Sequence, residues 1–138
     1  MQALQPIKLF AATMLVTLMA FTLACGYSSK STPPVAGTVP TIAQLAPPNA
    51  THGGAAFTLT VDGTNFGAKA MVNWNGVAQA SSTTYVSGSQ LMLAVPASAI
   101  TAAGTVSITV TNPGTPGTGM YGGGTLPETS AAMSFTVN

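Results

Sequence analysis

The sequence predicts an all-β fold, in which two antiparallel sheets pack face to face as a β-sandwich. Apolar and polar residues alternate with a period of two, which in a strand places neighbouring side chains on opposite faces of the sheet. A helix would need apolar residues spaced at about 3.6, and these segments lack that spacing. The alternation is strict in residues 57–62, 70–74, 91–95, 106–110 and 133–137.

Weaker alternation adds three further strands, at residues 41–45, 77–80 and 83–86. About seven short antiparallel strands, each with one apolar face, are best satisfied by two sheets that bury these faces against each other. The predicted core consists of large apolar residues from the alternating segments, namely Phe57, Leu59, Val61, Val72, Trp74, Leu91, Leu93, Val95, Val106, Ile108, Val110, Phe135 and Val137.

Turn residues separate these strands. Asn75-Gly76 suits the two positive-φ positions of a type I′ hairpin turn, and it joins the strand of Trp74 to that of Val77. Gly and Pro also mark the other expected reversals, which are Gly53-Gly54, Asp62-Gly63, Ser87-Gly88 and Asn112-Pro113-Gly114.

Composition excludes several classes of function. The chain has 138 residues, enough for one domain, and only 4% of them are charged, with 3 Lys and Arg against 2 Asp and Glu. Nucleic-acid binders need clustered positive charge, so nucleic-acid partners are excluded. Because the chain has no Arg, one His and one Cys, the side chains that usually transfer protons or ligate metals are scarce. We therefore predict no enzyme activity, no catalytic residue, no metal and no cofactor.

The amino terminus is typical of an export signal. Lys8 precedes an uncharged apolar stretch over residues 9–23, which is shorter than the roughly 20 residues of a membrane-spanning helix. Leu23-Ala24-Cys25-Gly26 follows, and here the chain resembles bacterial lipoproteins, in which a Cys is acylated and becomes the first residue of the mature chain. Thr22 stands where that family usually has an aliphatic residue.

The resemblance implies a lipoprotein-type signal peptide over residues 1–24 and a membrane anchor at Cys25. It places the protein in the bacterial cell envelope, at the outer membrane where one exists. Cys25 is the only Cys, so it cannot close a disulfide within the chain. Two alternatives stay open: a free Cys within a cleaved export signal, which would leave a secreted protein, and an apolar segment retained as the anchor.

Residues 25–38 have the composition of a tether. Ser, Thr, Gly and Pro follow one another there without hydrophobic periodicity. Pro33-Pro34 favours an extended polyproline II conformation, which would lift the following domain away from a lipid surface. A spacer without a length requirement is the alternative.

From residue 39 to the end, the chain resembles the IPT/TIG family of immunoglobulin-like domains. The motifs occur in the order of that family, at residues 39–42 with Pro47, 57–66, 72–76, 91–96, 104–114 and 135–137. The resemblance implies an immunoglobulin-like β-sandwich over residues 39–138. Gly63 is expected to allow a bend after a strand, and Phe66 is expected to turn back and close the end of the sandwich.

One segment departs from the family pattern. Residues 113–132 exceed the tight connection that usually precedes the last strand, and they contain a run of Gly. A connection of this length is either a functional loop or an insertion without a fixed conformation.

The reactive side chains form no catalytic or metal-binding pattern. Asp62 at a strand end and Glu128 in the long connection are not placed to converge as a carboxylate pair. Asp62 is expected to accept hydrogen bonds in its turn. His52 lies in another turn without neighbouring ligands, so an exposed position is expected. Trp74 alternates with Val72 and is predicted to point into the core instead of stacking on a sugar or peptide.

Two aromatic residues are the candidates for partner contact. Tyr121 lies among the glycines of the long connection, where an aromatic side chain can anchor a partner. Tyr85, in one of the weaker strands, is the second candidate.

Three functions remain open at this point. The first is a non-catalytic binding or structural module of an envelope lipoprotein that engages a protein or a glycan. The second is a passive spacer or a self-assembling surface subunit, since exposed strand edges and a nearly uncharged surface favour self-association. The third is an accessory carbohydrate-binding domain, because IPT/TIG-like domains also accompany polysaccharide-active enzymes.

Overall fold

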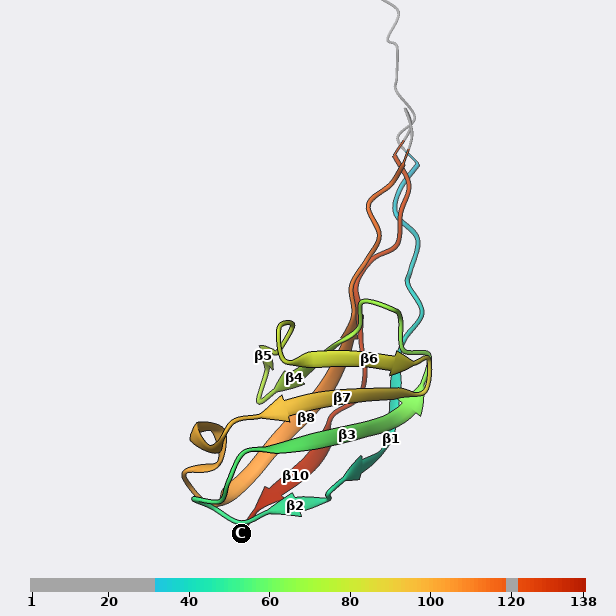
Figure 1. Ribbon diagram of the computed structural model, residues 1–138. Helices are drawn as coiled ribbons and strands as arrows, with labels where there is room; N and C mark the ends of the chain where they lie inside the picture. The colour runs from blue at the N-terminus through green and yellow to red at the C-terminus, as the bar shows by residue number, and fades with distance from the viewer. Residues whose placement is uncertain (1–31, 119–121) are drawn as a thin grey trace, which may run out of the picture. The chain divides into compact units, whose positions relative to one another are not determined.

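Two sheets make up the fold in the computed structural model, which describes residues 32–118 and 122–138 (Figure 1). Their strands pair antiparallel, except that β2 and β10 of the larger sheet pair in parallel. The four-stranded sheet has the order β1 (Thr41–Ala46), β3 (Phe57–Thr64), β7 (Gln90–Val95) and β6 (Thr83–Ser87). The larger sheet has the order β2 (Asn49–Ala50), β10 (Met133–Val137), β8 (Gly104–Asn112), β4 (Met71–Trp74) and β5 (Val77–Ala78). In addition, β9 (Glu128–Thr129) pairs with β8.

The architecture confirms the predicted all-β, immunoglobulin-like sandwich. Each of the eight segments predicted from alternation forms a strand. The strands β2 and β9 were not predicted, since two residues are too short to show a period. A 3₁₀ turn, η2 (Ala97–Ile100), follows β7. Within residues 32–118 and 122–138, no helical segment has the length and apolar character that crossing a bilayer requires.

The strand register aligns apolar side chains on the inner faces of both sheets. In the four-stranded sheet Leu59 lies opposite Leu93, and both are buried. In the other sheet Val72 lies opposite Val110, and neither side chain has measurable exposure. Burying one such side chain contributes about 1.5–3 kcal/mol, so the facing sheets are held mainly by the hydrophobic effect.

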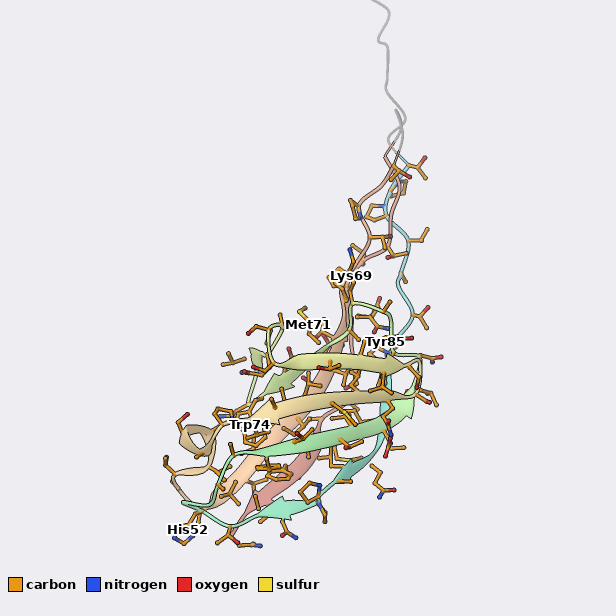
Figure 2. All side chains as sticks on the ribbon, viewed as in Figure 1. His52, Lys69, Met71, Trp74 and Tyr85 are labelled. Carbon is orange, nitrogen blue, oxygen red and sulfur yellow. The ribbon has the colours of Figure 1, made fainter. Side chains whose placement is uncertain are left out.

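Phe135 is the aromatic centre of this core and is fully buried. Its ring centroid lies 5.8 Å from that of Phe57 and 5.5 Å from that of Trp74. Trp74 is half-buried and packs against the core, which confirms the predicted inward orientation (Figure 2). Ten of the thirteen predicted core residues are buried members of this cluster, while Phe57, Trp74 and Val106 are partly buried and pack against it. The structure adds buried residues that the predicted core did not include: Ile42, Leu45, Phe66, Ala70 and Ile100.

The predicted type I′ turn at Asn75-Gly76 is confirmed, because both residues have positive φ, at 50° and 83°, between β4 and β5. The predicted reversal at Asp62-Gly63 is wrong. The strand β3 continues through Gly63 to Thr64, and the chain turns at Asn65, where φ is 61°.

Gly63 therefore serves close packing instead of a bend. A Cβ atom there would collide with the carbonyl oxygen of Thr41 in β1 and would lie 2.6 Å from Cζ of Phe66. Phe66 is buried and closes this end of the sandwich, as expected. The Phe66 N–H donates to the carbonyl of Gly88, at 2.9 Å, which fixes the turn against the β6–β7 hairpin.

The outer strands of both sheets are short or irregular. The register shifts between Ile42 and Gln44 in β1 and between Tyr85 and Ser87 in β6. The strands β2 and β5 have two residues each. Short strands and bulges interrupt the row of free peptide groups that a sheet edge offers to another chain.

Candidate functional site

The segment expected to be a tether and the long connection lie side by side (Figure 1). The Val35 N–H donates to the carbonyl of Gly124, and the Leu126 N–H donates to the carbonyl of Val35, each at 2.9 Å. Isolated parallel bridges join Thr32 to Gly122 and Val35 to Thr125. We call the described parts of these segments, residues 32–38, 113–118 and 122–127, the stalk.

Within the stalk, residues 113–118 and 122–127 pair with each other as the two arms of a hairpin. The Thr125 N–H donates to the carbonyl of Thr115 at 3.0 Å, and the two threonine hydroxyls lie 3.0 Å apart. Gly117 allows the arms to approach, because a Cβ there would collide with the main chain of Gly123. The predicted loop over residues 113–132 thus contains ordered pairing, and its end forms β9.

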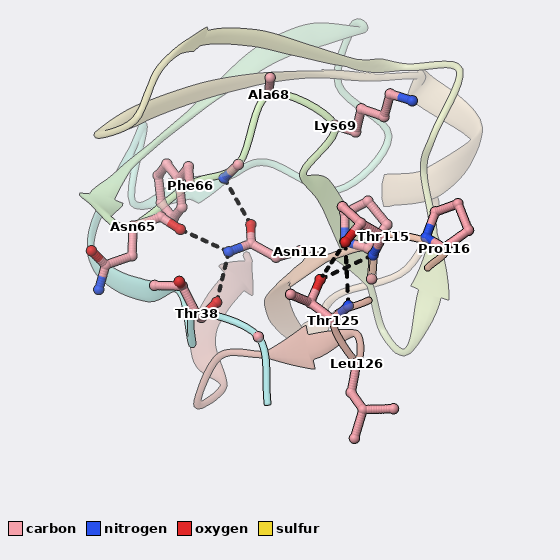
Figure 3. A pocket seen from close by; sticks show the side chains of 14 residues that line it. Thr38, Asn65, Phe66, Ala68, Lys69, Asn112, Thr115, Pro116, Thr125 and Leu126 are labelled. Carbon is pink, nitrogen blue, oxygen red and sulfur yellow. Dashed lines mark hydrogen bonds between the residues drawn. The ribbon is translucent and has the colours of Figure 1, made fainter. Parts of the chain in front are cut away.

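Asn112, the last residue of β8, joins the stalk to the sandwich. Its Nδ2 donates to the carbonyls of Thr38 and Asn65, both at 2.8 Å, and its Oδ1 accepts from the Gly67 N–H at 2.9 Å (Figure 3). Asn65 in turn donates from Nδ2 to the carbonyl of Val39 at 3.3 Å. One amide side chain therefore connects the amino-terminal linker, the β3–β4 turn and the end of β8.

A groove of about 600 Å³ lies beside this junction, between the β3–β4 turn and the base of the stalk. We call it the stalk-base groove. Figure 3 shows side chains that line it. Both polar and apolar groups line it, among them those of Asn65, Lys69, Thr115, Pro116 and Leu126.

The charge and exposure of the lining residues make the stalk-base groove the best candidate for ligand contact. Lys69 is exposed, and it is the only Lys or Arg side chain that the structure describes. Leu126 is 48% exposed, so a large apolar side chain borders the same groove. A ligand with both polar and apolar parts would find a partner for each part here.

Two of the three candidate site residues predicted from sequence, Cys25 and Tyr121, lie outside the described residues. Tyr85 is described: it lies in the outer strand β6 with 40% exposure and does not line the stalk-base groove. Tyr85 is therefore the only predicted site residue within residues 32–118 and 122–138.

The two carboxylates lie in different sheets. Asp62 is part of β3 in the four-stranded sheet, whereas Glu128 is in β9 beside β8. The prediction that Asp62 accepts hydrogen bonds within a turn is wrong. Its Oδ1 accepts from Nε2 of Gln90 at 2.8 Å, and Gln90 is the residue of β7 that lies opposite Asp62 in β3. Glu128 likewise lies in a strand instead of a loop.

His52 is exposed, as expected, in the turn after β2 (Figure 2). Its Nδ1 lies 2.7 Å from the carbonyl oxygen of Asn138, which also accepts from the His52 N–H. Among the residues that the structure describes, no group of three or more His, Cys, Asp or Glu side chains could hold a metal ion. Over the same residues, every buried polar side-chain atom has a hydrogen-bond partner.

Sequence reasoning missed the residues of the stalk-base groove. One signal was available, because Lys69 is one of the few cations of a nearly uncharged chain. Asn112 was recognised only as the end of a strand. Its role depends on Thr38 and Asn65, which are distant in sequence, so no local pattern could reveal it.

Comparison with known proteins supports the fold at the level of a family. A search of curated proteins and of solved structures finds no match to this chain. The family model of the IPT/TIG domain matches residues 40–127, which include β1 to β8 and the hairpin of the stalk. Domains of this family are generally non-catalytic immunoglobulin-like modules that serve binding or structure. The chain therefore belongs to the IPT/TIG domain family.

Proposed function

We propose that this chain is a non-catalytic binding module of a bacterial cell-envelope lipoprotein, anchored by lipid at Cys25 and engaging a protein or a glycan. Membership of the IPT/TIG family supports a binding or structural role. The separation of Asp62 and Glu128 into different sheets supports the non-catalytic reading. The anchor rests on the sequence around Cys25, which resembles a lipoprotein processing site.

The stalk-base groove is the main observation that supports the binding role. Its volume of about 600 Å³ lies within the range of about 300–1,000 Å³ that is usual for ligand sites. Lys69 supplies a positive charge at the groove, and Leu126 supplies exposed apolar surface. A partner segment that carries an acidic or hydroxyl group beside an apolar group matches this combination.

The binding test compares the groove with the second sequence candidate. Purified full-length chain carrying Cys25→Ser, which has no acyl chain to insert into lipid, is incubated with isolated cell envelopes. The bound fraction is compared with that of the same chain carrying Lys69→Ser with Leu126→Ser, or Tyr85→Ser. Loss of central contacts commonly weakens binding by about tenfold or more, so we expect this loss for the groove variant only. If the groove variant binds as well as the parent chain and Tyr85→Ser loses binding, the binding site lies at β6 instead.

Tyr121 is tested in the same assay. Tyr121→Ser with residues 122–124 removed should reduce binding if the hairpin itself contacts the partner. The removed residues include Gly124, which accepts a hydrogen bond from Val35, so the single variant Tyr121→Ser is measured separately.

The anchor is tested by membrane fractionation. Cys25→Ser removes the acylated sulfur and should shift the protein from the membrane pellet to the soluble fraction, because acyl chains contribute about 0.8 kcal/mol per buried CH₂. Ser29→Ala is the matched control and should stay in the pellet. A Cys25→Ser protein that pellets at the wild-type level would refute lipidation and leave the binding role untouched.

A passive spacer is the second candidate, and the stalk favours it, because it gives part of the expected tether a defined conformation. Self-assembly is less favoured, since the outer strands are short or bulged. Sedimentation of the mature chain should therefore show one species at all concentrations. Absence of envelope binding by the Cys25→Ser chain, with the unmutated chain anchored in the membrane pellet, would select the spacer over the binding module.

A further inference from the structure

We propose that the hairpin between β8 and β9 is a clamp for the amino-terminal linker, and that it sets the direction in which the linker leaves the sandwich. This role differs from the partner-binding loop that the sequence favours for residues 113–132. The relevant linker residues are 32–38, and the clamp is formed by residues 113–118 and 122–127.

The first step of the argument is the hydrogen bonding of Val35. Its N–H and its carbonyl are both used, by the Gly124 carbonyl and by the Leu126 N–H, at 2.9 Å each. A linker without a partner would leave these groups to water. Here the linker pairs in parallel with one arm of the hairpin, as an added strand pairs with a sheet edge.

The second step concerns the main-chain groups of the hairpin that face the linker. The arm at Thr125 already pairs with Thr115 on its other side, through main-chain and hydroxyl groups. The Gly124 carbonyl and the Leu126 N–H point toward the linker and are bonded to Val35. The hairpin therefore presents a donor and an acceptor at the spacing that an extended segment needs.

The third step is the junction with the sandwich. Asn112 donates to the Thr38 carbonyl, and Asn65 donates to the Val39 carbonyl. The linker is thus bonded to the sandwich at residues 38 and 39 and to the hairpin at residue 35. Two separated attachments define a direction, whereas one attachment would leave the linker free to swing.

The direction of the linker determines the end from which it leaves the sandwich. The linker and the hairpin run away from the sandwich at the end where Lys69 lies, while the turn of His52 and the carboxyl terminus lie at the other end (Figures 1 and 2). A clamped linker therefore leaves the sandwich at the end opposite His52.

The test uses proline substitutions in the linker of the full-length chain. Val35→Pro removes the N–H that donates to Gly124, and it leaves the sandwich untouched because Val35 is 60% exposed. Ala36→Pro is the matched control, since the Ala36 N–H donates no hydrogen bond within the described residues. Val35→Ala controls for the loss of the side chain.

The measurement is amide hydrogen exchange in peptides that cover residues 32–38 and 122–127. In the wild type the amides of Val35 and Leu126 should be protected, one in each peptide. Val35→Pro has no amide at residue 35, so its effect is measured in residues 122–127, where exchange should be about tenfold faster, the effect of one or two hydrogen bonds. Both controls should match the wild type. Linker amides that exchange at the unprotected rate in the wild type, or no response to Val35→Pro, would overturn the clamp.

A second variant examines the junction independently. Asn112→Leu removes the hydrogen bonds to the carbonyls of Thr38 and Asn65 and to the Gly67 N–H, but not the Thr115–Thr125 pairing, so exchange should rise in residues 32–38 more than in residues 113–118. Thermal unfolding is recorded alongside to establish that the sandwich remains folded. Unchanged linker exchange in a folded Asn112→Leu protein would contradict the role of the junction.

Discussion

The sandwich and the stalk are both built from extended chain, but different forces hold them. In the sandwich, Leu59 and Phe135 are fully buried, so apolar burial adds to the main-chain hydrogen bonds. In the stalk, Val35 is 60% exposed and Leu126 is 48% exposed. The stalk therefore depends on main-chain hydrogen bonds and close glycine contacts, each of small net stability in water.

This difference predicts two levels of stability in one chain. Paired segments with little buried apolar surface open locally at lower free energy than a packed core. The stalk should open without unfolding the sandwich, whereas unfolding of the sandwich should release the stalk. Three substitutions test this difference in stability between the sandwich and the stalk.

The largest effect is expected from Phe135→Ala. It removes the ring that contacts both Phe57 and Trp74, and truncation of a buried aromatic side chain costs about 3–5 kcal/mol. Urea unfolding followed by tryptophan fluorescence measures the free energy of unfolding. The exposed Val35→Ala serves as control and should be neutral. A loss for Phe135→Ala below about 1 kcal/mol would contradict the central position of this ring in the core.

An intermediate effect is expected from Gly63→Ala. The added Cβ would meet the Thr41 carbonyl and the Phe66 ring, and forcing extra atoms into a packed site costs about 1–3 kcal/mol. Gly88→Ala is a matched control at the same end of the sandwich, where the nearest atom would be the Phe66 carbonyl oxygen at 3.7 Å. The same urea experiment applies, and equal stability of the two variants would refute the close contact of β1 and β3.

The smallest effect on global stability is expected from Gly117→Ala, although the collision there is more severe than that at Gly63. The added Cβ would overlap the main chain of Gly123 and separate the arms of the hairpin. Because the stalk adds little to the core, the free energy of unfolding should change by less than about 0.5 kcal/mol. Exchange of the amides in residues 122–127 should rise by about tenfold. A loss of global stability as large as that of Gly63→Ala would show that the two regions are coupled.

Much of the sandwich could be predicted from sequence, because period-two alternation is a local signal of a half-buried strand. The core around Leu59, Val72 and Phe135 and the turn at Asn75-Gly76 follow from such signals. The prediction of a chain reversal at Asp62-Gly63 was wrong for a physical reason. Gly63 is required by the approach of β1 and Phe66, and a glycine needed for contact looks the same in sequence as one needed for a turn.

The candidate site was much less predictable. Tyr85 has an exposed position, but it lies apart from the groove beside Lys69, which did not emerge from any motif. The groove exists because Asn65, Asn112 and Leu126 come together from three separate parts of the chain. Contacts between residues so distant in sequence form only in the complete fold.

The sequence by itself determined the class of the fold, the faces of its main strands and most of its core, because each depends on the alternation of neighbouring side chains. Only the tertiary structure decided the partners of the linker and the hairpin. Glycine- and proline-rich segments carry no apolar period, and they pair through main-chain groups that every residue possesses. The identity of their partner is therefore set by where the sandwich places Thr38 and Asn112, and not by their own side chains.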